Sequence, residues 1–391
     1  MEKTLEDGMI PEAFAQKRKN MDRYWLWLCS CPGLYRPQIA GLIGYFGDPK
    51  KLYDAESREL IRWKKLADDE TTKWVNALID YKDTTTVVEA EEKLSRRKLH
   101  FVSRQSPLFP QKLLNLPDCP FGLFYRGKLP DPGRPAAAVI GARRCSSYGQ
   151  QMAVILGKAL AGEGYQVISG MAAGVDGTAQ SACLSAHGSS FAVLGSGADV
   201  CYPPENEGLY DLLIQEGGIL SEFPPMTPPL RHHFPMRNRL ISGLSDAVIV
   251  VEARAQSGSL ITADLALDQG KEVFAVPGRY NDLLSYGCNR LIEQGAGIVL
   301  SADSLLENLA IALDLKRVPP KEEDLIRKIE ENMGEDERKV YAALNFEARS
   351  VDEIASSTGL TLLQAMRVLL DLQLKNLALE VSKNRYIRKI A

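Results

Sequence analysis

The stretch Ala136-Ala-Ala-Val-Ile-Gly-Ala-Arg-Arg-Cys-Ser-Ser-Tyr-Gly149 decides the fold of this 391-residue chain, because a short apolar run passes directly into a glycine turn and a helix start. Six further short apolar runs follow it, and helical stretches separate them. This alternation predicts an α/β domain with a mostly parallel sheet and helices on both faces. The strands are expected at Ala136–Ile140, Gln166–Ser169, Ser190–Leu194, Ile219–Leu220, Ala247–Val251, Glu272–Val276 and Ile298–Leu300.

Candidate binding residues follow the first two strands. Ligands of open α/β sheets bind beyond the carboxyl ends of the strands, where helix N-termini offer unpaired N–H groups. Gly141 permits a ligand to approach the backbone closely, and Arg143 can form bidentate hydrogen bonds with a phosphate. Ser146 or Ser147 can cap the next helix. The glycine-rich turn 169–177 leaves room for a bulky ligand, although tight strand-to-helix turns need glycine without any ligand. The candidates here are Gly141, Arg143, Arg144, Ser146, Ser169, Gly170 and Gly174.

A second group of candidates follows later strands. Phe234-Pro-Met-Arg-Asn-Arg239 brings two arginines and an asparagine to a helix start, where cation and helix dipole both favour an anion. The structural alternative is an ion pair between either arginine and Asp246 or Glu252. Ser257-Gly-Ser-Leu-Ile-Thr-Ala263 offers hydroxyl and N–H groups at another helix N-terminus, either to bind phosphate or to cap the helix. The candidates here are Arg237, Asn238, Arg239, Ser257 and Thr262.

Composition and missing motifs exclude several classes of protein. With a net charge of −3, the overall field does not draw the molecule to a polyanion, so nucleic-acid binding must come from local clusters. The seven cysteines are scattered and expected to be reduced, and the four histidines include no His-x-x-x-His, so no metal site is expected. No window approaches the ~20 apolar residues of a membrane span, and no secretory signal is evident, which favours the cytoplasm.

Catalytic motifs are missing as well. The sequence has no Gly-x-x-x-x-Gly-Lys-Ser/Thr phosphate loop, no Gly-x-Ser-x-Gly elbow and no cysteine with an evident histidine base. Asp176 and Glu252 are conceivable general acids or bases, and a structural role is favoured for both. The central domain is therefore expected to bind a ligand without catalysing a reaction.

Proline-rich breaks divide the chain. We expect a disordered or frayed segment at 1–20, a small helical domain at 21–100, the α/β domain at 101–316, a linker at 317–334 and a last domain at 335–391. The first domain has short apolar runs at helical spacing, as in a helix-hairpin-helix, but its Pro-Gly turn holds only Gly33, so packing is favoured over DNA contact. In the last domain, three helical patterns and two strand-like runs around Ser382-Lys-Asn384 fit a winged helix-turn-helix.

The ordered motifs of the central domain resemble the DprA family, also called Smf. The resemblance covers roughly residues 100–310 and rests on Gly141-x-Arg143-x-x-Ser146-x-Tyr-Gly149, Ser169-Gly170-x-Ala-x-Gly174-x-Asp176, Tyr202-Pro203-x-x-Asn206, Ser221-Glu222, Phe234-Pro-x-Arg-Asn-Arg239, Ser257-Gly-Ser-Leu-Ile-Thr-Ala263, Val276-Pro-Gly278 and Asn289-x-Leu-Ile-x-x-Gly-Ala296. It implies an extended Rossmann-like domain, flanked by a helical domain like the sterile-alpha-motif or helix-hairpin-helix domain of many members and by a winged helix.

For function, the resemblance implies a homodimer that binds single-stranded DNA and helps to load the RecA recombinase on DNA taken up in natural transformation. It implies no reaction and no nucleotide cofactor. Gly141, Arg143 and Ser146 would line the strand-binding pocket with the turn 169–174, with Arg143 ranked first, and the arginines and asparagine at 237–239 would contact phosphates or brace the pocket. Members often have lysine after Tyr-Pro, whereas this chain has Pro204-Glu205, for which Arg231 or Arg144 are candidate substitutes.

Binding without sequence preference needs a basic groove and rings that accept any base. The groove is expected from Arg143, Arg144, Arg237, Arg239 and Arg279, and the candidate rings are Tyr148, Tyr202, Phe234 and Tyr280. Phe234 ranks lowest among the rings, because Phe-Pro before a helix often packs inward.

Two other functions stay open. One is a nucleotide-processing enzyme of the lysine-decarboxylase-like group, whose Pro-Gly-Gly-x-Gly-Thr motif is replaced here by Ser257-Gly-Ser-Leu-Ile-Thr262. The other is a transcriptional regulator whose winged helix reads duplex DNA, although Thr361, Gln364 and Arg367 are the only polar candidates at the start of its second helix. The apolar stretch Asn289–Leu300 is either a dimer interface or a buried edge.

Overall fold

The computed structural model describes residues 12–64, 72–314, 333–345, 348–375 and 377–388. These residues group into two compact units, one that ends at residue 314 and one that begins at residue 333. The predictions for residues 1–11 and for most of the linker at 317–334 fall outside the described residues. Residues 12–20, which were expected to be disordered or frayed, belong to helix α1 (Glu12–Cys29).

The first unit is built on a nine-stranded sheet with the strand order β1-β2-β6-β5-β4-β3-β7-β8-β9. The strands from β3 to β9 pair in parallel, and β1 and β2 add an antiparallel edge next to β6 that the sequence pattern did not predict. The mostly parallel α/β sheet is thereby confirmed. The strands are β1 (His100–Ser103), β2 (Gly122–Gly127), β3 (Ala136–Ile140), β4 (Gln166–Ser169), β5 (Ser189–Val193), β6 (Gly218–Ser221), β7 (Ala247–Val250), β8 (Glu272–Ala275) and β9 (Gly297–Ile298).

Strand β3 lies at the centre of this sheet and packs on both faces. Its side chains alternate between two hydrophobic clusters, with Ala136, Ala138 and Ile140 in one and Ala137 and Val139 in the other. Every residue of the strand is buried, as expected for a central parallel strand with helices on both faces. The chain adds β4, β5 and β6 on one side of β3 and β7, β8 and β9 on the other, so the strand order reverses between β3 and β7.

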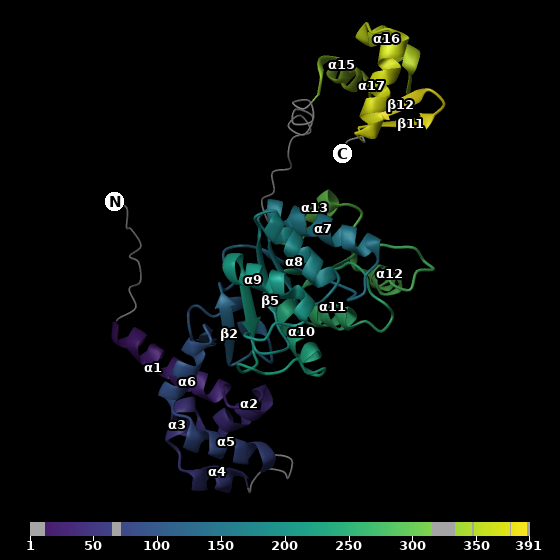
Figure 1. Ribbon diagram of the computed structural model, residues 1–391. Coiled ribbons are helices and arrows are strands. Elements are labelled where there is room, and N and C mark those ends of the chain that lie inside the picture. Colours follow the sequence, from purple (N-terminus) through teal and green to yellow (C-terminus); the bar gives the residue numbers. More distant parts are fainter. Residues whose placement is uncertain (1–11, 65–71, 315–332, 346–347, 376, 389–391) are drawn as a thin grey trace, which may run out of the picture. The chain divides into compact units, whose positions relative to one another are not determined.

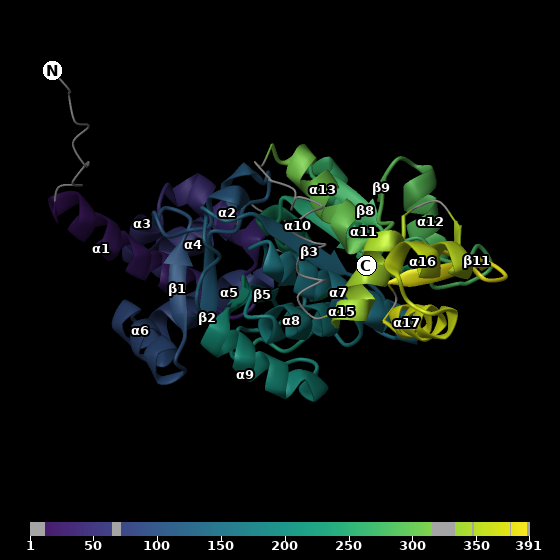
Figure 2. The ribbon, with the colours of Figure 1, turned by 90° about the horizontal axis from the view of Figure 1, so that it is seen from above.

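Helices cover both faces of the sheet (Figures 1 and 2). Leucines of α7 (Ser147–Gly162) and α13 (Ala302–Ala312) lie in one cluster with α8 (Val175–Ser185). On the other face lie α10 (His233–Leu244), α11 (Gly258–Asp268) and α12 (Tyr286–Glu293). A further helix, α9 (Glu207–Glu216), precedes β6. Figure 2 shows α10 and α11 on the opposite side of β3 from α7 and α8.

The N-terminal helices share a core with this α/β region. Trp25 of α1 stacks on Phe121, with ring centroids 5.2 Å apart, and Trp27 donates its Nε1–H to the carbonyl oxygen of Thr85 at 2.8 Å. Both tryptophans are buried. The predicted helical segment is therefore helical, but it belongs to the same compact unit as the sheet. The other helices of this part are α2 (Arg36–Phe46), α3 (Pro49–Asp54), α4 (Ser57–Lys64), α5 (Thr72–Thr84) and α6 (Val87–Arg96).

The second unit has the predicted winged-helix arrangement. Its helices are α15 (Glu335–Ala343), α16 (Val351–Thr358) and α17 (Leu362–Leu374), and its strands β10 (Arg349–Ser350), β12 (Arg385–Arg388) and β11 (Ala378–Ser382) pair in that order. Gly359 ends α16 in the left-handed conformation that glycine adopts without strain. Thr361 and Gln364 then form a capping box at the start of α17. A cluster that includes Tyr341, Ile354 and Leu369 forms the core of this unit.

Candidate nucleic-acid interface

A cavity of about 420 Å³ lies where the strand order reverses, beyond the carboxyl ends of β3 and β7. A topological switch point of this kind is where open α/β sheets bind their ligands. Four segments supply most of the lining: the loop after β3, the loop after β4, the first turns of α10, and the loop from β7 into α11. Leu284, in the loop before α12, adds to it. Of the twelve predicted site residues, the cavity brings together Gly141, Arg143, Arg144, Arg237, Asn238, Ser257 and Thr262.

Arg143 and Phe234 meet at this cavity. The guanidinium carbon of Arg143 lies 4.9 Å from the centroid of the Phe234 ring, a cation–π distance. Tyr202 lies beside the same ring, with centroids 5.7 Å apart and planes at 39°. Phe234, the ring ranked lowest among the candidates, is half-buried and lines the cavity.

Three exposed arginines lie along the cavity. Arg143 and Arg144 are exposed and, within the described parts of the chain, have no carboxylate partner. Arg254, which sequence reasoning missed, is also exposed and lines the cavity. It follows β7 as Arg143 follows β3, so the placement of a basic residue just after a strand was the signal that could have found it. These guanidinium groups make the mouth of the cavity basic although the whole chain carries a net charge of −3.

Arg237 lies beneath this surface and holds the cavity together. Its guanidinium donates to the carbonyl oxygen of Gly170 at 3.1 Å and to that of Val193, and its side chain is almost completely buried. Burial lowers its pKa to about 10, partly offset by the nearby charge of Asp176. Arg237 therefore braces the pocket, which is one of the two roles that the family resemblance implied.

Asp176 is the buried counter-charge. Its carboxylate accepts N–H groups from Gly141 at 3.3 Å and Gly170 at 3.2 Å, which ties the loops after β3 and β4 together. Burial raises the pKa of this carboxyl, against the opposing effect of Arg237. With both oxygens engaged by backbone, the role of Asp176 here is structural.

Four of the predicted residues shape the cavity from behind its wall. Ser146 caps α7 and donates its hydroxyl to Glu252 at 2.5 Å, and Ser169 donates to the carbonyl oxygen of Val139 at 2.7 Å. A Cβ at Gly170 would lie 2.6 Å from the guanidinium of Arg237, and Gly174 has a φ of +80° beneath the loop of Arg143. The other predicted glycine, Gly141, lies against Val175 and lines the cavity.

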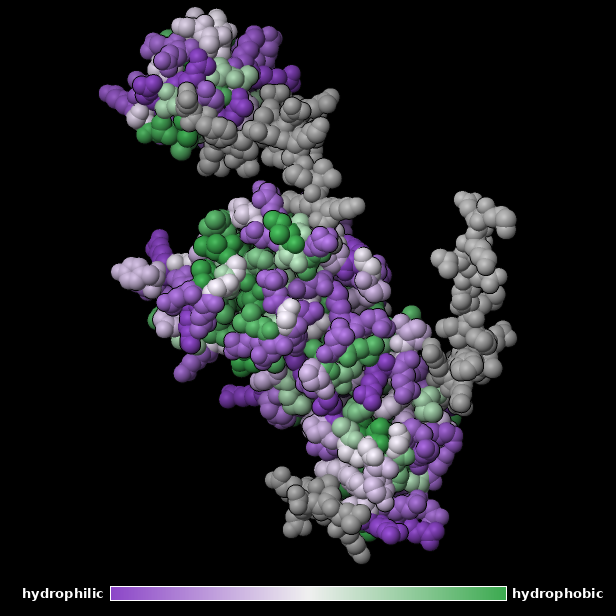
Figure 3. All heavy atoms as spheres, turned by 180° about the vertical axis from the view of Figure 1, so that it is seen from behind, coloured by the Kyte–Doolittle hydropathy of each residue, from purple (hydrophilic) through white to green (hydrophobic). Residues whose placement is uncertain are grey.

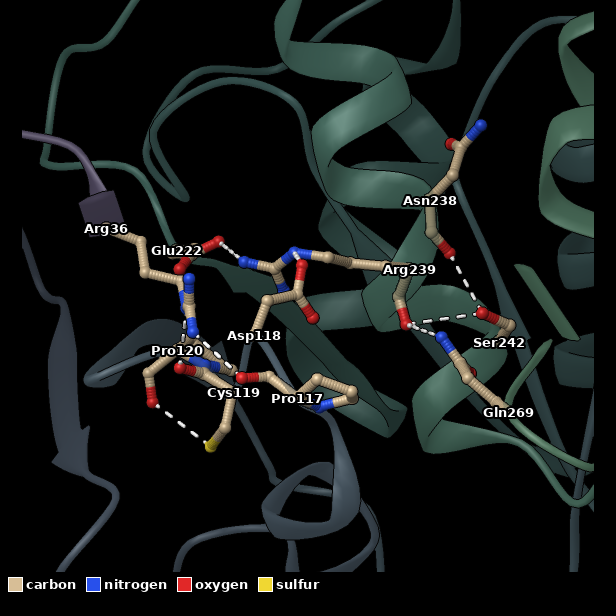
Figure 4. Close-up of polar contacts among 10 residues, drawn as sticks. All are labelled: Arg36, Pro117, Asp118, Cys119, Pro120, Glu222, Asn238, Arg239, Ser242 and Gln269. Carbon is tan, nitrogen blue, oxygen red and sulfur yellow. Dashed lines mark hydrogen bonds and ion pairs between the residues drawn. The ribbon is translucent and has the colours of Figure 1, made fainter. Parts of the chain in front are cut away.

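Arg239 does not line the cavity and points toward Glu222 and Asp118 (Figure 4). Its guanidinium pairs with Asp118 at 2.8 Å and with Glu222 at 2.5 Å, and its side chain is only 9% exposed. The prediction that Arg239 belongs to the binding groove is therefore not supported by its position. The structural alternative, an ion pair between either arginine and Asp246 or Glu252, is also wrong. Asp246 pairs with Lys112, and Glu252 accepts a hydrogen bond from the N–H of Ser146.

The N-terminus of α11 forms another wall. Ser257 caps this helix, and its hydroxyl lies 2.7 Å from that of Ser259. Asn238 donates from its amide to the carbonyl oxygen of Gly258 at 3.3 Å, which joins α10 to α11. Thr262 is buried one turn further along and still lines the cavity. The start of this helix lines the same cavity as the arginines, and a helix N-terminus favours an anion.

The other predicted cations and rings lie elsewhere. Arg231 and Arg279 do not line the cavity, so of the two candidate substitutes for the missing lysine only Arg144 does. Tyr148 donates its hydroxyl to the carbonyl oxygen of Pro277 at 3.0 Å, and Tyr280 is 91% exposed.

A second, larger cavity of about 790 Å³ lies between α1, α6 and the edge strands. Arg23 in its lining forms a bidentate ion pair with Glu91, so the charges of these two side chains cancel.

The described part of the chain has neither a cluster of metal ligands nor a helix that could cross a membrane. There, no three His, Cys, Asp or Glu side chains gather as metal ligands. In the same residues, no helix is both long and apolar enough to cross a bilayer.

Comparison with known proteins identifies both units. The family of DNA recombination-mediator protein A matches residues 100–310, and the DprA winged helix domain matches residues 320–382. Protein Smf of Escherichia coli is 38% identical over 276 residues, which cover 70% of this chain and 74% of that protein. DNA processing protein DprA of Streptococcus pneumoniae is 42% identical over 198 residues, 51% of this chain and 70% of that protein. The X-ray structure of the pneumococcal protein matches with a TM-score of 0.61 at 33% identity, covering 73% of this chain and 97% of that chain.

Proposed function

Because this chain belongs to the family of DNA recombination-mediator protein A, we propose that it binds single-stranded DNA in the cavity beyond β3 and β7 and catalyses no reaction. The observation that carries the proposal is the pairing of the exposed Arg143 guanidinium with the Phe234 ring at this cavity. Arginine contacts any phosphate and an aromatic ring stacks on any base, so the pair suits a strand of any sequence.

Each group at the cavity has a defined part in this binding. The DNA backbone phosphates contact Arg143, Arg144 and Arg254. Each contact releases condensed counterions, so the affinity for DNA falls as the salt concentration rises. Phe234, supported by Tyr202, offers a base its ring. A base that reaches this ring must be free of a partner strand, because the bases of a duplex stack on one another inside the helix. This is why the cavity favours a single strand.

The carboxylates beside the cavity support a binding role without catalysis. Asp176 accepts two backbone N–H groups, and Glu252 accepts both the N–H and the hydroxyl of Ser146. A general base must reach a proton of the substrate, and both carboxylates are instead bound to the protein itself. Both are also buried, with 7% of Asp176 and 2% of Glu252 exposed.

We assign dimer formation to the surface around Asn289–Leu300. Large apolar side chains are exposed here, among them Leu283 and Leu300, each with more than 70% of its surface accessible. Figure 3 shows hydrophobic residues gathered on one face of the first unit. Exposed apolar side chains that gather on one face commonly mark protein–protein interfaces. In this proposal a homodimer in the cytoplasm protects incoming single strands during natural transformation and hands them to the RecA recombinase.

Competition binding tests the proposed ligand. A fluorescent single-stranded oligonucleotide is bound to the full chain and challenged with unlabelled single strand, duplex of the same sequence, or mononucleotide. The proposal expects displacement by single strands of unrelated sequence and poor displacement by duplex. Preference for one duplex sequence would instead identify a winged-helix regulator, and hydrolysis of the mononucleotide would identify a nucleotide-processing enzyme.

A further inference from the structure

Helix α17 of the winged-helix unit carries two apolar faces. Ala365, Val368, Leu369 and Leu372 pack into the core of the unit. Nearly opposite them lies a second set of apolar side chains, exposed to solvent, that we call the α17 stripe: Leu363, Met366, Leu370 and Leu374. Their spacing of three, four and four residues places them on one side of the helix. Leu363 and Leu374 are 80% and 79% exposed, so nothing in the described chain covers the two ends of the stripe.

The α17 stripe is unsuited to a DNA groove. In a helix-turn-helix this second helix enters the major groove with polar side chains near its N-terminus. The side chain of Gln364 is already used, because its Oε1 accepts the N–H of Thr361 at 2.9 Å and the Thr361 hydroxyl at 2.7 Å. A phosphate-lined groove would also surround four apolar side chains with charge. The helix therefore presents a surface for protein, which an exposed apolar patch commonly marks.

The stripe is complementary to itself. If two α17 helices pair antiparallel about a two-fold axis near residue 369, Leu363 of one copy lies opposite Leu374 of the other. Arg367 and Asp371 flank the stripe on one side, four residues apart, and the same axis brings Arg367 of one copy against Asp371 of the other, twice. A two-fold interface requires one patch that matches itself in shape and charge. The polar surface of a monomer is not expected to match itself in both shape and charge.

We propose that the winged-helix unit is a self-association module in which α17 pairs antiparallel with α17 of a second copy of this chain. Apolar contacts along the stripe supply the affinity, and the two Arg367–Asp371 pairs set the register and direction. This interface is separate from the DNA-binding cavity and from the surface around Asn289–Leu300, since it belongs to the second compact unit.

Disulfide trapping tests which residues meet. The residues from 333 onward contain no native cysteine, so a bond to this unit can be assigned by peptide mass mapping. In the full chain, Leu363→Cys and Leu374→Cys are introduced together and singly, and oxidised under mild conditions. The proposal expects a covalent dimer through residues 363 and 374 in the double variant. In a dimer of a single variant, the two introduced cysteines, one from each copy, lie at opposite ends of the antiparallel helix pair. Such a variant is therefore expected to form the disulfide at least tenfold more slowly.

Charge reversal tests the register in the same assay. Arg367→Asp or Asp371→Arg alone sets like charges against each other and is expected to slow trapping of the double-cysteine chain about threefold or more. The two reversals together restore the opposite charges and the rate. Unchanged thermal unfolding of every variant shows that the unit is folded, as expected for exposed positions. No 363–374 bond, equal trapping by the single variants, or no rescue by the double reversal would overturn the proposal.

Discussion

The guanidinium of Arg143 lies over the ring of Phe234, 4.9 Å from its centroid, although the two residues are 91 positions apart in the chain. The loop after β3 supplies the cation and the first turn of α10 supplies the ring. A cation over a ring face is attracted by the ring quadrupole, so each group keeps the other in place. The arrangement offers a nucleic acid one phosphate contact and one stacking surface side by side.

Phe234→Ala removes the stacking surface. We expect single-strand affinity to fall by about 1–3 kcal/mol, the usual effect of losing one base–aromatic contact. Phe234→Tyr keeps a ring and serves as the control, with affinity close to that of the unaltered chain. Isothermal titration with a homopolymeric oligonucleotide measures both. Equal affinity of the alanine and tyrosine variants would show that no base uses this ring.

Gly174→Ala distorts the loop that carries Arg143. The residue has a φ of +80°, and its new Cβ would lie 2.6 Å from the carbonyl oxygen of Arg143. We expect weaker DNA binding together with a lower midpoint of thermal unfolding. Gly162→Ala is the matched control, since its Cβ meets nothing within 4 Å in α7 and alanine stabilises a helix by about 0.5–1 kcal/mol. A Gly174→Ala variant that binds and unfolds normally would contradict the assigned role of this glycine.

Arg239→Ala and Arg254→Ala separate stability from binding. Removing Arg239 takes the ion-pair partner from Glu222, whose side chain is only 14% exposed, so we expect the free energy of unfolding to fall by about 3–5 kcal/mol while the folded fraction still binds DNA. Removing the exposed Arg254 is expected to weaken binding and leave stability unchanged. Urea unfolding and DNA titration of both variants measure the two effects. The reverse pattern would place Arg239 in the interface.

The effect of Arg239→Ala depends on pH. Burial raises the pKa of Glu222 and Arg239 lowers it, so the variant has a still higher pKa at this carboxyl. If a carboxyl has a higher pKa in the folded protein than in the unfolded one, the protein loses stability as the pH rises from the unfolded-state pKa through the folded-state pKa. The destabilisation by Arg239→Ala is therefore expected to be smaller at pH 5 than at pH 8. Urea unfolding at both values measures it, and an equal loss at the two pH values would exclude Glu222 as the cause.

Leu300→Asp tests the proposed dimer surface. In a chain that ends at residue 314, and so lacks α17, we expect this change to convert a dimer to a monomer, because a buried charge opposes an apolar interface. Leu108→Asp is the control, as Leu108 is similarly exposed outside this surface. Sedimentation equilibrium gives the mass of each. A dimer that survives Leu300→Asp would move the interface elsewhere.

The central strands were predictable because each is a short apolar run between turns, and β3 and β4 have the predicted bounds. The edge strand β1 was not, because the four residues His100–Ser103 include two polar ones and acquire strand structure only by pairing with β2. The core that the N-terminal helices share with the sheet likewise depends on contacts such as that of Trp25 with Phe121, which no local pattern encodes.

The candidate site shows a similar limit. Arg237 and Arg239 stand in one motif, yet residues two apart on a helix point to nearly opposite sides, so only Arg237 faces the cavity. Phe234 lies three residues before Arg237 and shares its side, with the guanidinium 5.9 Å from the ring. Placing the motif on a helix would have favoured Phe234 over Arg239. The partner Asp118, more than a hundred residues away, could only come from the fold.

The salt dependence of single-strand binding by the full chain and by Arg143→Ala tests the central claim most directly. If Arg143 contacts a backbone phosphate, the variant binds more weakly at low salt, and the slope of log affinity against log salt concentration becomes shallower by about 0.7. Fluorescence anisotropy over several salt concentrations gives both slopes. Parallel slopes with equal affinities would show that the cavity beyond β3 and β7 is not where the strand binds.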